Sequence, residues 1–172
     1  MTSPLPYGLV AIGRNEGERL KQCLFSASHA ELIVYVDSGS SDGSAAWART
    51  NGFEVVELDM GRGFTAARAR NAGFKRLVQM APHLQYVQFV DGDCELAQEW
   101  PHMAVSFLEQ RSDAAAVCGR LRERYPERSV YNWLCDREWD RPAGEIKSCA
   151  GNVMMRIRSL EHVGGYREDV IA

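Results

Sequence analysis

Two aspartates separated by one glycine are the residues of this 172-residue chain whose spacing most directly predicts chemistry. Asp91, Gly92 and Asp93 directly follow the apolar run from Tyr86 to Val90. Glycine tolerates a tight backbone that lets both carboxylates turn toward one point, although Asp-Gly pairs are also common turn formers. Carboxylate oxygens are ligands that Mn²⁺ or Mg²⁺ prefers, and such a cation can hold a diphosphate. The motif therefore predicts a metal-diphosphate site at Asp91 and Asp93.

Two other loops are equally rich in polar residues. Gly13 to Glu16 follows the apolar run Tyr7 to Ile12, and Asp37 to Asp42 follows the apolar run Leu32 to Val36. Ligands of open α/β sheets bind beyond the carboxyl ends of the strands, so we expect all three loops at one edge. Asp37 is predicted to accept hydrogen bonds from a base or ribose, whereas the serines after it are also typical helix N-caps.

The elements that must position these loops alternate between short apolar runs and longer amphipathic stretches. Strands are predicted at 7–12, 32–36, 53–58 and 86–90, and helices at 16–28, 40–51 and 65–80. This alternation predicts right-handed βαβ crossovers, a mostly parallel sheet and the α/β class. After residue 96 the predicted elements are helices at 98–111, 130–139 and 158–162, a strand at 114–121 and a strand pair flanking Gly151.

Composition limits the functions that the chain can have. Hydrophobic residues make up 45% and charged residues 25%, which is ordinary for one soluble globular domain. The net charge of -3, with both signs well mixed, gives no electrostatic footprint for nucleic acid. Five cysteines without a CxxC pair indicate reduced thiols and a cytoplasmic location. No apolar stretch approaches the roughly 20 residues of a membrane-spanning helix.

Six motifs in a fixed order make the chain resemble the family 2 glycosyltransferases. They are VAIGRNEGERL at 10–20, VDSGSSDGS at 36–44, ARARNAGF at 67–74, VQFVDGDCEL at 87–96, AGNVMMRIRSL at 150–160 and GGYRED at 164–169. The resemblance implies the GT-A fold, a Rossmann-like nucleotide-diphospho-sugar transferase fold. It also implies a single domain over 1–172, with a nucleotide-binding part at 1–96 and a partial acceptor-side part at 97–172.

The resemblance also implies roles for particular side chains. Asp93 would ligate the metal directly, and Asp91 would contact the ribose or reach the metal through water. The other residues placed at the nucleotide are Ile12, Arg14, Glu16, Asp37, Ser38, Arg68 and Asn71. The acceptor-side candidates are Trp133, Trp139, Gly151 and Asn152. The two tryptophans are at least as well explained as a packed helix face.

The reaction that the resemblance implies is an inverting sugar transfer from a UDP, GDP or dTDP donor, with Mn²⁺ or Mg²⁺. The acceptor is a hydroxyl group of a glycan, a lipid or another compound, and it would be deprotonated for in-line attack. Ser38 stands where the family often has a second acid. The family's general base usually lies beyond the position of Ala172, so we expect a truncated chain with an unassigned base. A longer form acting on a lipid-linked acceptor would work at the inner membrane face.

Other interpretations stay open from the sequence. The missing base fits a non-catalytic nucleotide-sugar-binding module. Gly61 to Ala66 fits the GxGxxA pattern of NAD-dependent dehydrogenases, but the next strand-end acid, Asp91, follows Gly61 by thirty residues instead of about 20. Asp91 and Asp93 also fit an aspartyl phosphatase, although Glu95 replaces its usual Thr or Val. A calcium loop is excluded because its twelfth position is His102.

Overall fold

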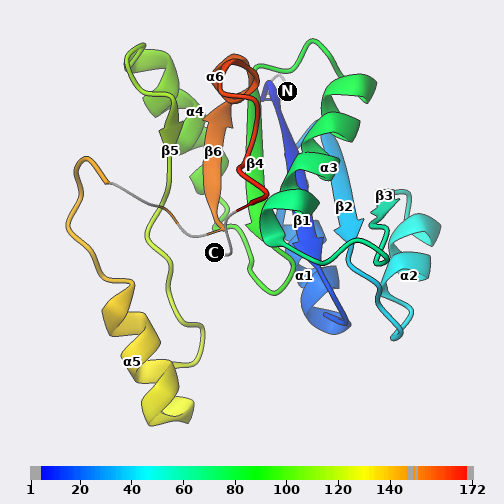
Figure 1. Ribbon diagram of the computed structural model, residues 1–172. Helices are drawn as coiled ribbons and strands as arrows, with labels where there is room; N and C mark the ends of the chain where they lie inside the picture. Colours follow the sequence, from blue (N-terminus) through cyan, green and yellow to red (C-terminus); the bar gives the residue numbers. More distant parts are fainter. Residues whose placement is uncertain (1–4, 147–148, 150, 170–172) are drawn as a thin grey trace.

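A six-stranded sheet with the strand order β3-β2-β1-β4-β6-β5 forms the centre of the protein (Figure 1). The computed structural model describes residues 5–146, 149 and 151–169. The four parallel strands are β1 (Tyr7–Gly13), β2 (Leu32–Asp37), β3 (Glu54–Glu57) and β4 (Tyr86–Asp91). The strand β6 (Val153–Arg156) runs antiparallel to both β4 and β5 (Ala116–Val117). The mostly parallel α/β architecture is therefore confirmed.

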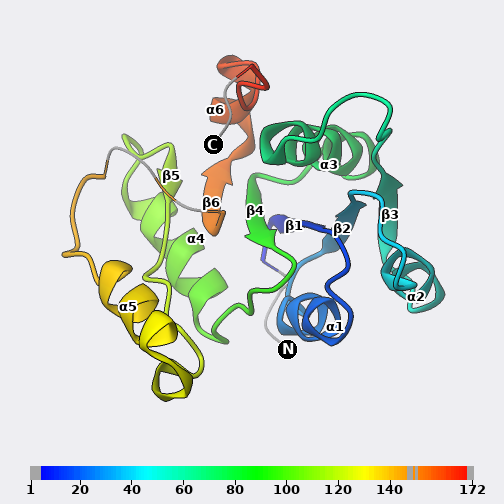
Figure 2. The same ribbon diagram turned by 60° about the horizontal axis from the view of Figure 1, so that its bottom comes forward.

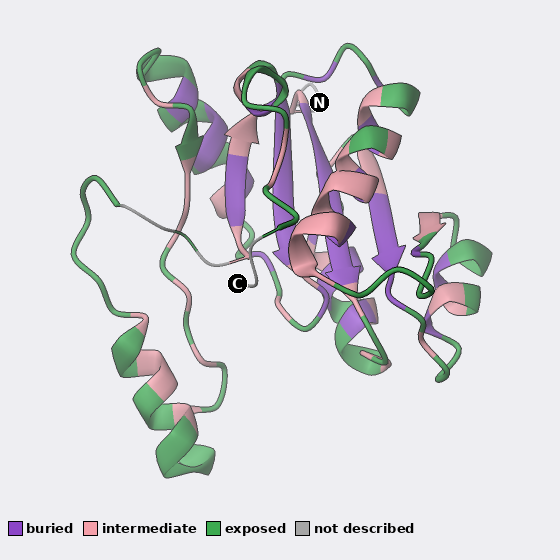
Figure 3. Cartoon of the chain, in the orientation of Figure 1, coloured by how far each residue is buried: buried purple, intermediate pink, exposed green. Residues whose placement is uncertain are grey.

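The two central strands, β1 and β4, are apolar because both of their faces are covered, with Gln88 of β4 as a buried polar exception. In β1, Leu9 and Ala11 pack into the layer on one face of the sheet, and Val10 and Ile12 pack into the layer on the other. Figure 3 shows the buried residues gathered along these strands. Burial on both faces fixes the strand positions and hence the positions of the loops that follow them.

Helices cover both faces of the sheet (Figure 2). One face carries α3 (Ala66–Met80) and α6 (Ile157–His162), and the other carries α1 (Glu18–Ser26), α2 (Ser44–Thr50) and α4 (Trp100–Gln110). Thr65 caps α3 by accepting a hydrogen bond from the Arg68 backbone N–H at 3.1 Å. Gly73 lets α3 approach the sheet closely, since a Cβ there would meet the side chains of Val10 and Val36.

A short 3-10 helix (η1, Pro126–Arg128) and α5 (Val130–Glu138) form an arm that projects from the body (Figures 1 and 3). The structure describes α5 in full and none of its residues is buried. Tyr131 and Trp133 are among the exposed large side chains of this helix. Within the described ranges, no helix combines the length and the apolar character needed to cross a membrane.

Some boundaries differ from those expected from sequence. Helix α1 begins at Glu18 and not at residue 16, because Asn15 and Gly17 adopt positive φ angles of 58° and 53°. The strand expected at 114–121 is reduced to β5, whose residues Ala116 and Val117 pair with Met155 and Met154 of β6. Of the strand pair expected around Gly151, β6 follows the glycine, while residues 147, 148 and 150 lie outside the described residues.

Candidate functional site

The carboxyl ends of β1, β2 and β4 bring the three polar loops to one edge of the sheet, which confirms the expectation from sequence. Gly13 of β1 stands opposite Asp37 of β2, and Ile12 stands opposite Asp91 of β4. The backbone N–H of Gly92 donates to the Ile12 carbonyl at 2.8 Å. The register of the central strands therefore sets the relative positions of the loops.

The first two loops are hydrogen-bonded to each other. The backbone N–H of Asn15 donates to Ser40 Oγ at 2.9 Å, and that of Gly17 donates to Asp42 Oδ2 at 3.0 Å. Hydrogen bonds from Ser44, followed by the one from Gly17, hold the pKa of Asp42 below its ordinary value. Because the side chains of the second loop satisfy backbone groups of the first, the two loops form one wall of the site.

Asp37 closes the second loop upon itself. Its carboxyl group is 4% exposed and accepts hydrogen bonds from the backbone N–H groups of Gly39 and Ser40 at 3.0 and 2.8 Å. The Tyr35 hydroxyl donates to its other oxygen at 2.8 Å. The neighbouring Ser38 is 1% exposed, and in the described part of the chain its Oγ has no hydrogen-bond partner. A contact of Asp37 with a base or ribose stays a prediction.

Asp91 is held by an arginine and by a close backbone. Its Oδ1 lies 2.8 Å from Nη2 of Arg70, whose side chain is 14% exposed and lies over the Tyr166 ring at 5.7 Å. A Cβ on Gly151 would come within 2.5 Å of Asp91 Cγ, so the backbone of this glycine lies directly against the carboxylate. With 44% of its side chain exposed, Asp91 still faces solvent.

Asp93 is exposed at the start of the loop after β4. Cys94 Sγ donates to Asp93 Oδ1 at 3.5 Å, and burial raises the pKa of this thiol to about 12, with further contributions from the charges of Asp93 and Asp91. Burial also raises the pKa of Glu16, and the charge of Asp93 adds to that effect, while Arg19 opposes it. Carboxylates from two loops thus concentrate negative charge at this edge.

The donor set fits a hard divalent cation that brings part of its own coordination shell. Among the described residues, no three His, Cys, Asp or Glu side chains form a complete metal cluster. Asp93 nevertheless offers an exposed carboxylate beside Asp91 at the end of β4. Mg²⁺ and Mn²⁺ are commonly held by one or two carboxylates together with water and substrate phosphate oxygens. The pair is suited to that kind of partial site.

Arg68 and Asn71 hold neighbouring segments in place. Arg68 donates to the Gly63 carbonyl at 2.9 Å and also to the carbonyls of Asp59 and Arg62, so it secures the loop between β3 and α3. Asn71 donates to the Tyr166 carbonyl at 2.9 Å and accepts from its N–H at 2.8 Å. Their predicted contacts with a nucleotide stay predictions.

Arg70 is a residue of the site that the sequence motifs do not single out. The buried side of α3 consists of Ala69, Gly73 and Leu77, which are spaced by four residues. At 100° per residue, Arg68 and Arg70 project to opposite sides of that buried stripe. Helical periodicity was therefore the signal that could have shown that the two arginines have different neighbours.

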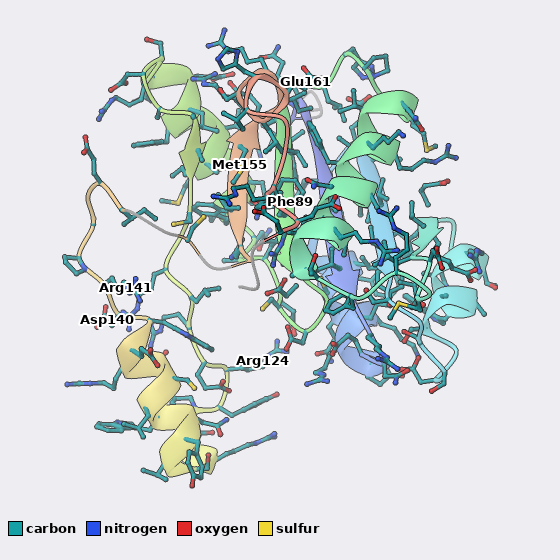
Figure 4. All side chains as sticks on the ribbon, viewed as in Figure 1. Phe89, Arg124, Asp140, Arg141, Met155 and Glu161 are labelled. Carbon is teal, nitrogen blue, oxygen red and sulfur yellow. The ribbon has the colours of Figure 1, made fainter. Side chains whose placement is uncertain are left out.

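The acceptor-side candidates occupy two separate places. Asn152 lies in the body of the protein, where its Oδ1 accepts a hydrogen bond from Gln88 Nε2 at 2.6 Å. Trp133 lies in α5 and Trp139 is the C-cap residue of that helix. Figure 4 labels Asp140, the residue after Trp139, on the arm. The start of the arm is secured to the β4 loop by Arg124, which donates to Glu95 Oε2 at 2.9 Å. An acceptor contact by either tryptophan stays a prediction.

A cavity of about 360 Å³ lies at the opposite edge of the sheet. Its lining includes Leu84 and Gln85, which precede β4, and Ile157 and Glu161 of α6 (Figure 4). Because β4 separates these residues from Asp91, the cavity is distinct from the polar loops.

The sequence profile of glycosyl transferase family 2 matches residues 10–163. The glycosyltransferase AglE of Haloferax volcanii is 32% identical over 139 residues, covering 73% of this chain and 43% of AglE. The chain thus spans less than half the length of this curated relative.

Two crystal structures show the same architecture at low sequence identity. Staphylococcus aureus TarS has a TM-score of 0.64 and 14% identity, over 93% of this chain and 30% of TarS. Glucosyl-3-phosphoglycerate synthase of Mycobacterium tuberculosis, in complex with Mn²⁺, UDP-glucose and phosphoglyceric acid, has a TM-score of 0.62 and 17% identity. That match covers 90% of this chain and 57% of the synthase. The fold is the GT-A fold, as the sequence motifs implied.

Proposed function

The chain belongs to glycosyl transferase family 2, and from that premise we propose that it transfers a sugar from a nucleoside diphosphate donor to an acceptor hydroxyl group. The observation that carries the proposal is the meeting of three polar loops at the carboxyl edge of β1, β2 and β4, with Asp91 and Asp93 in the last loop. This edge is the ligand-binding edge of open α/β sheets. The synthase with similar fold described above was crystallised with Mn²⁺ and UDP-glucose.

Asp93 is proposed as the direct ligand of Mn²⁺ or Mg²⁺, because its carboxylate is exposed and next to the end of β4. When bound, the cation would neutralise charge on the departing diphosphate. Asp91 is proposed to bind the ribose or to reach the cation through water. Its ion pair with Arg70 supports this less direct role, since one oxygen already has a charged partner.

The nucleoside is proposed to lie against the wall formed by the first two loops. Arg14 is exposed there, and Ser38 brings a buried hydroxyl group that has no partner within the described residues. Ile12 and Asp37 lie at the strand ends behind this wall, and because both are nearly fully buried they are proposed to fix its position. Glu16 is proposed to add a negative charge near Asp93, so that the anionic diphosphate binds poorly unless a cation is present.

In the proposed reaction, the acceptor oxygen forms a bond to the anomeric carbon while the bond from that carbon to the diphosphate oxygen breaks, with inversion. The acceptor proton passes to a general base. We assign that base to neither Glu168, which accepts a hydrogen bond from Asn71, nor Asp169, which pairs with Arg167.

The proposal is tested by titrating UDP, GDP and dTDP into the chain in the presence of Mn²⁺, with calorimetry as the measurement. We expect heat from at least one nucleotide, and a marked loss of affinity when EDTA removes the cation, because the carboxylates then repel the diphosphate. Heat from none of the three would refute the proposal. Nucleotide binding without hydrolysis or transfer of a sugar, in this chain and in a longer form, would instead favour a binding module.

Replacing Gly151 with alanine is expected to weaken Mn²⁺-dependent nucleotide binding by about tenfold, the order found when partners that orient a metal ligand are changed. The added Cβ would displace the Asp91 carboxylate and with it the ion pair to Arg70. Calorimetry measures the effect. The matched control is Gly63→Ala, where an added Cβ meets no atom within 4 Å. Equal affinities of the two variants would contradict the role given to Gly151.

A further inference from the structure

Gln88 is a fully buried polar side chain in β4, three residues before Asp91. Its Nε2 donates to Asn152 Oδ1 at 2.6 Å and to the Phe89 carbonyl at 2.7 Å. Its Oε1 accepts a hydrogen bond from Trp100 Nε1 at 2.8 Å. Burying an amide is costly unless its hydrogen bonds are made, so this position is highly sensitive to the placement of the partners.

One of these partners, Asn152, is adjacent in the chain to a residue of the proposed diphosphate site. Asn152 is the neighbour of Gly151, whose backbone lies against the Asp91 carboxylate. In the sheet, Gln88 stands opposite Met154 of β6, so the side-chain bond to Asn152 extends the β4–β6 pairing beyond its last paired residue, Val153. Figure 4 shows Phe89 and Met155 on these two neighbouring strands.

The other partner, Trp100, lies against the segment that precedes the arm. Trp100 begins α4, and a Cβ on Gly119 would lie 2.9 Å from its ring. The chain then continues from Gly119 to Arg124, which is paired with Glu95 in the loop after β4. A single amide thus bonds to Asn152, next to Gly151, and to Trp100, whose ring lies against Gly119.

We propose that Gln88 is a positioning residue for the diphosphate site. It holds Asn152, and through Gly151 it fixes the orientation of the Asp91 carboxylate beside Arg70. A leucine of similar size would fill the same space in the core but would leave Asn152 and Trp100 without their partner. This inference rests on the proposed function and assigns to that site a residue that does not touch the nucleotide.

The first test compares nucleotide affinities in Mn²⁺ by calorimetry. Gln88→Leu is expected to bind about tenfold more weakly than the original chain, as is usual when a residue that orients a metal-site carboxylate is lost. Tyr7→Phe is the matched control, because the Tyr7 hydroxyl is buried in the same α4-side core and has no hydrogen-bond partner within the described chain. Its affinity is expected to stay within about twofold.

A double-mutant cycle separates positioning from general loosening of the core. Asn152→Ala alone is expected to give the same loss of about tenfold, and Gln88→Leu/Asn152→Ala no more than either single variant, since both changes remove one link. Losses that multiply to about 100-fold, or a Gln88→Leu variant that binds like the original chain, would overturn the proposal. If Gln88→Leu does not fold, the Asn152→Ala variant serves as the test, because Asn152 is only partly buried. An unchanged nucleotide affinity of Asn152→Ala would then overturn the proposal.

Hydrogen exchange without nucleotide distinguishes failure of this inference from failure of the proposed function. The peptide spanning residues 151–156 is expected to exchange faster in Gln88→Leu and to stay unchanged in Tyr7→Phe. If no nucleotide binds to the original chain, the proposed function fails, yet faster exchange would still support the link from Gln88 to Gly151. Unchanged exchange in Gln88→Leu would refute that link.

Discussion

Replacing Asp93 with asparagine is expected to lower the affinity for the bound nucleotide in Mn²⁺ by about 100-fold, equivalent to roughly 2.7 kcal/mol. Asparagine keeps the shape of the side chain but removes the charge that the cation needs. Asp93 is exposed, and within the described residues its hydrogen-bond partner is the neighbouring thiol of Cys94, so the substitution should leave the fold intact. Calorimetry with and without Mn²⁺ measures the effect.

The dependence on metal tells the two aspartates apart. Without the cation, Asp93→Asn should bind nucleotide at least as well as the original chain, because a repulsive charge has gone. Asp91→Asn should lose affinity in both conditions, since it removes the carboxylate proposed to bind the ribose, and that contact does not need the cation. The matched control is Asp113→Asn, an exposed aspartate paired with Arg111 after α4. If Asp93→Asn bound as tightly as this control in Mn²⁺, Asp93 would not be the metal ligand.

Replacing Gly73 with valine is expected to lower the free energy of unfolding by about 3 kcal/mol, at the upper end of the range for overpacked cores. A Cβ at this position would lie 2.7 Å from Val36 Cγ2 and closer still to Val10. Val10 in β1 and Val36 in β2 are both fully buried, so the helix must move away from the sheet. Since α3 carries Arg70, nucleotide binding should weaken as well.

Urea denaturation followed by circular dichroism measures this loss. Gln79→Val is the matched control, because it places the same branched side chain on the exposed side of the same helix. The control should lose less than about 1 kcal/mol, the scale of helix propensity differences. Equal losses in the two variants would show that helix propensity, and not close packing of α3 on β1 and β2, explains the effect.

Much of the fold followed from local patterns in the chain. The runs at Tyr7 and Tyr86 are apolar except for Gln88, and such runs are recognisable because burial on both faces leaves no place for alternation. The predicted boundaries of helices and strands were wrong where a backbone conformation or the extent of strand pairing decided where an element begins or ends. Asn15 and Gly17 delay α1 by their positive φ angles, and β5 is short because its pairing with β6 comprises Ala116 and Val117 alone within the described residues.

The candidate site was predictable to the extent that it lies at strand ends. Asp91 and Asp93 were selected because of their spacing and the strand before them, and the structure brings their loop to the same edge as the other two. The partners of Asp91 were not predictable in this way. Arg70 comes from a helix that precedes β4, and Gly151 comes from a segment sixty residues later in the chain.

The sequence by itself determined the alternation of strands and helices, the chemical character of the three loops and the family to which the chain belongs. These properties depend on residues close together in the chain, where periodicity and turn chemistry act directly. Only the tertiary structure decided that Arg70 neutralises Asp91, that Asp37 closes its own loop and that Gln88 connects Asn152 with Trp100. Such contacts arise from the order of strands and the angles of packed helices, which no local pattern encodes.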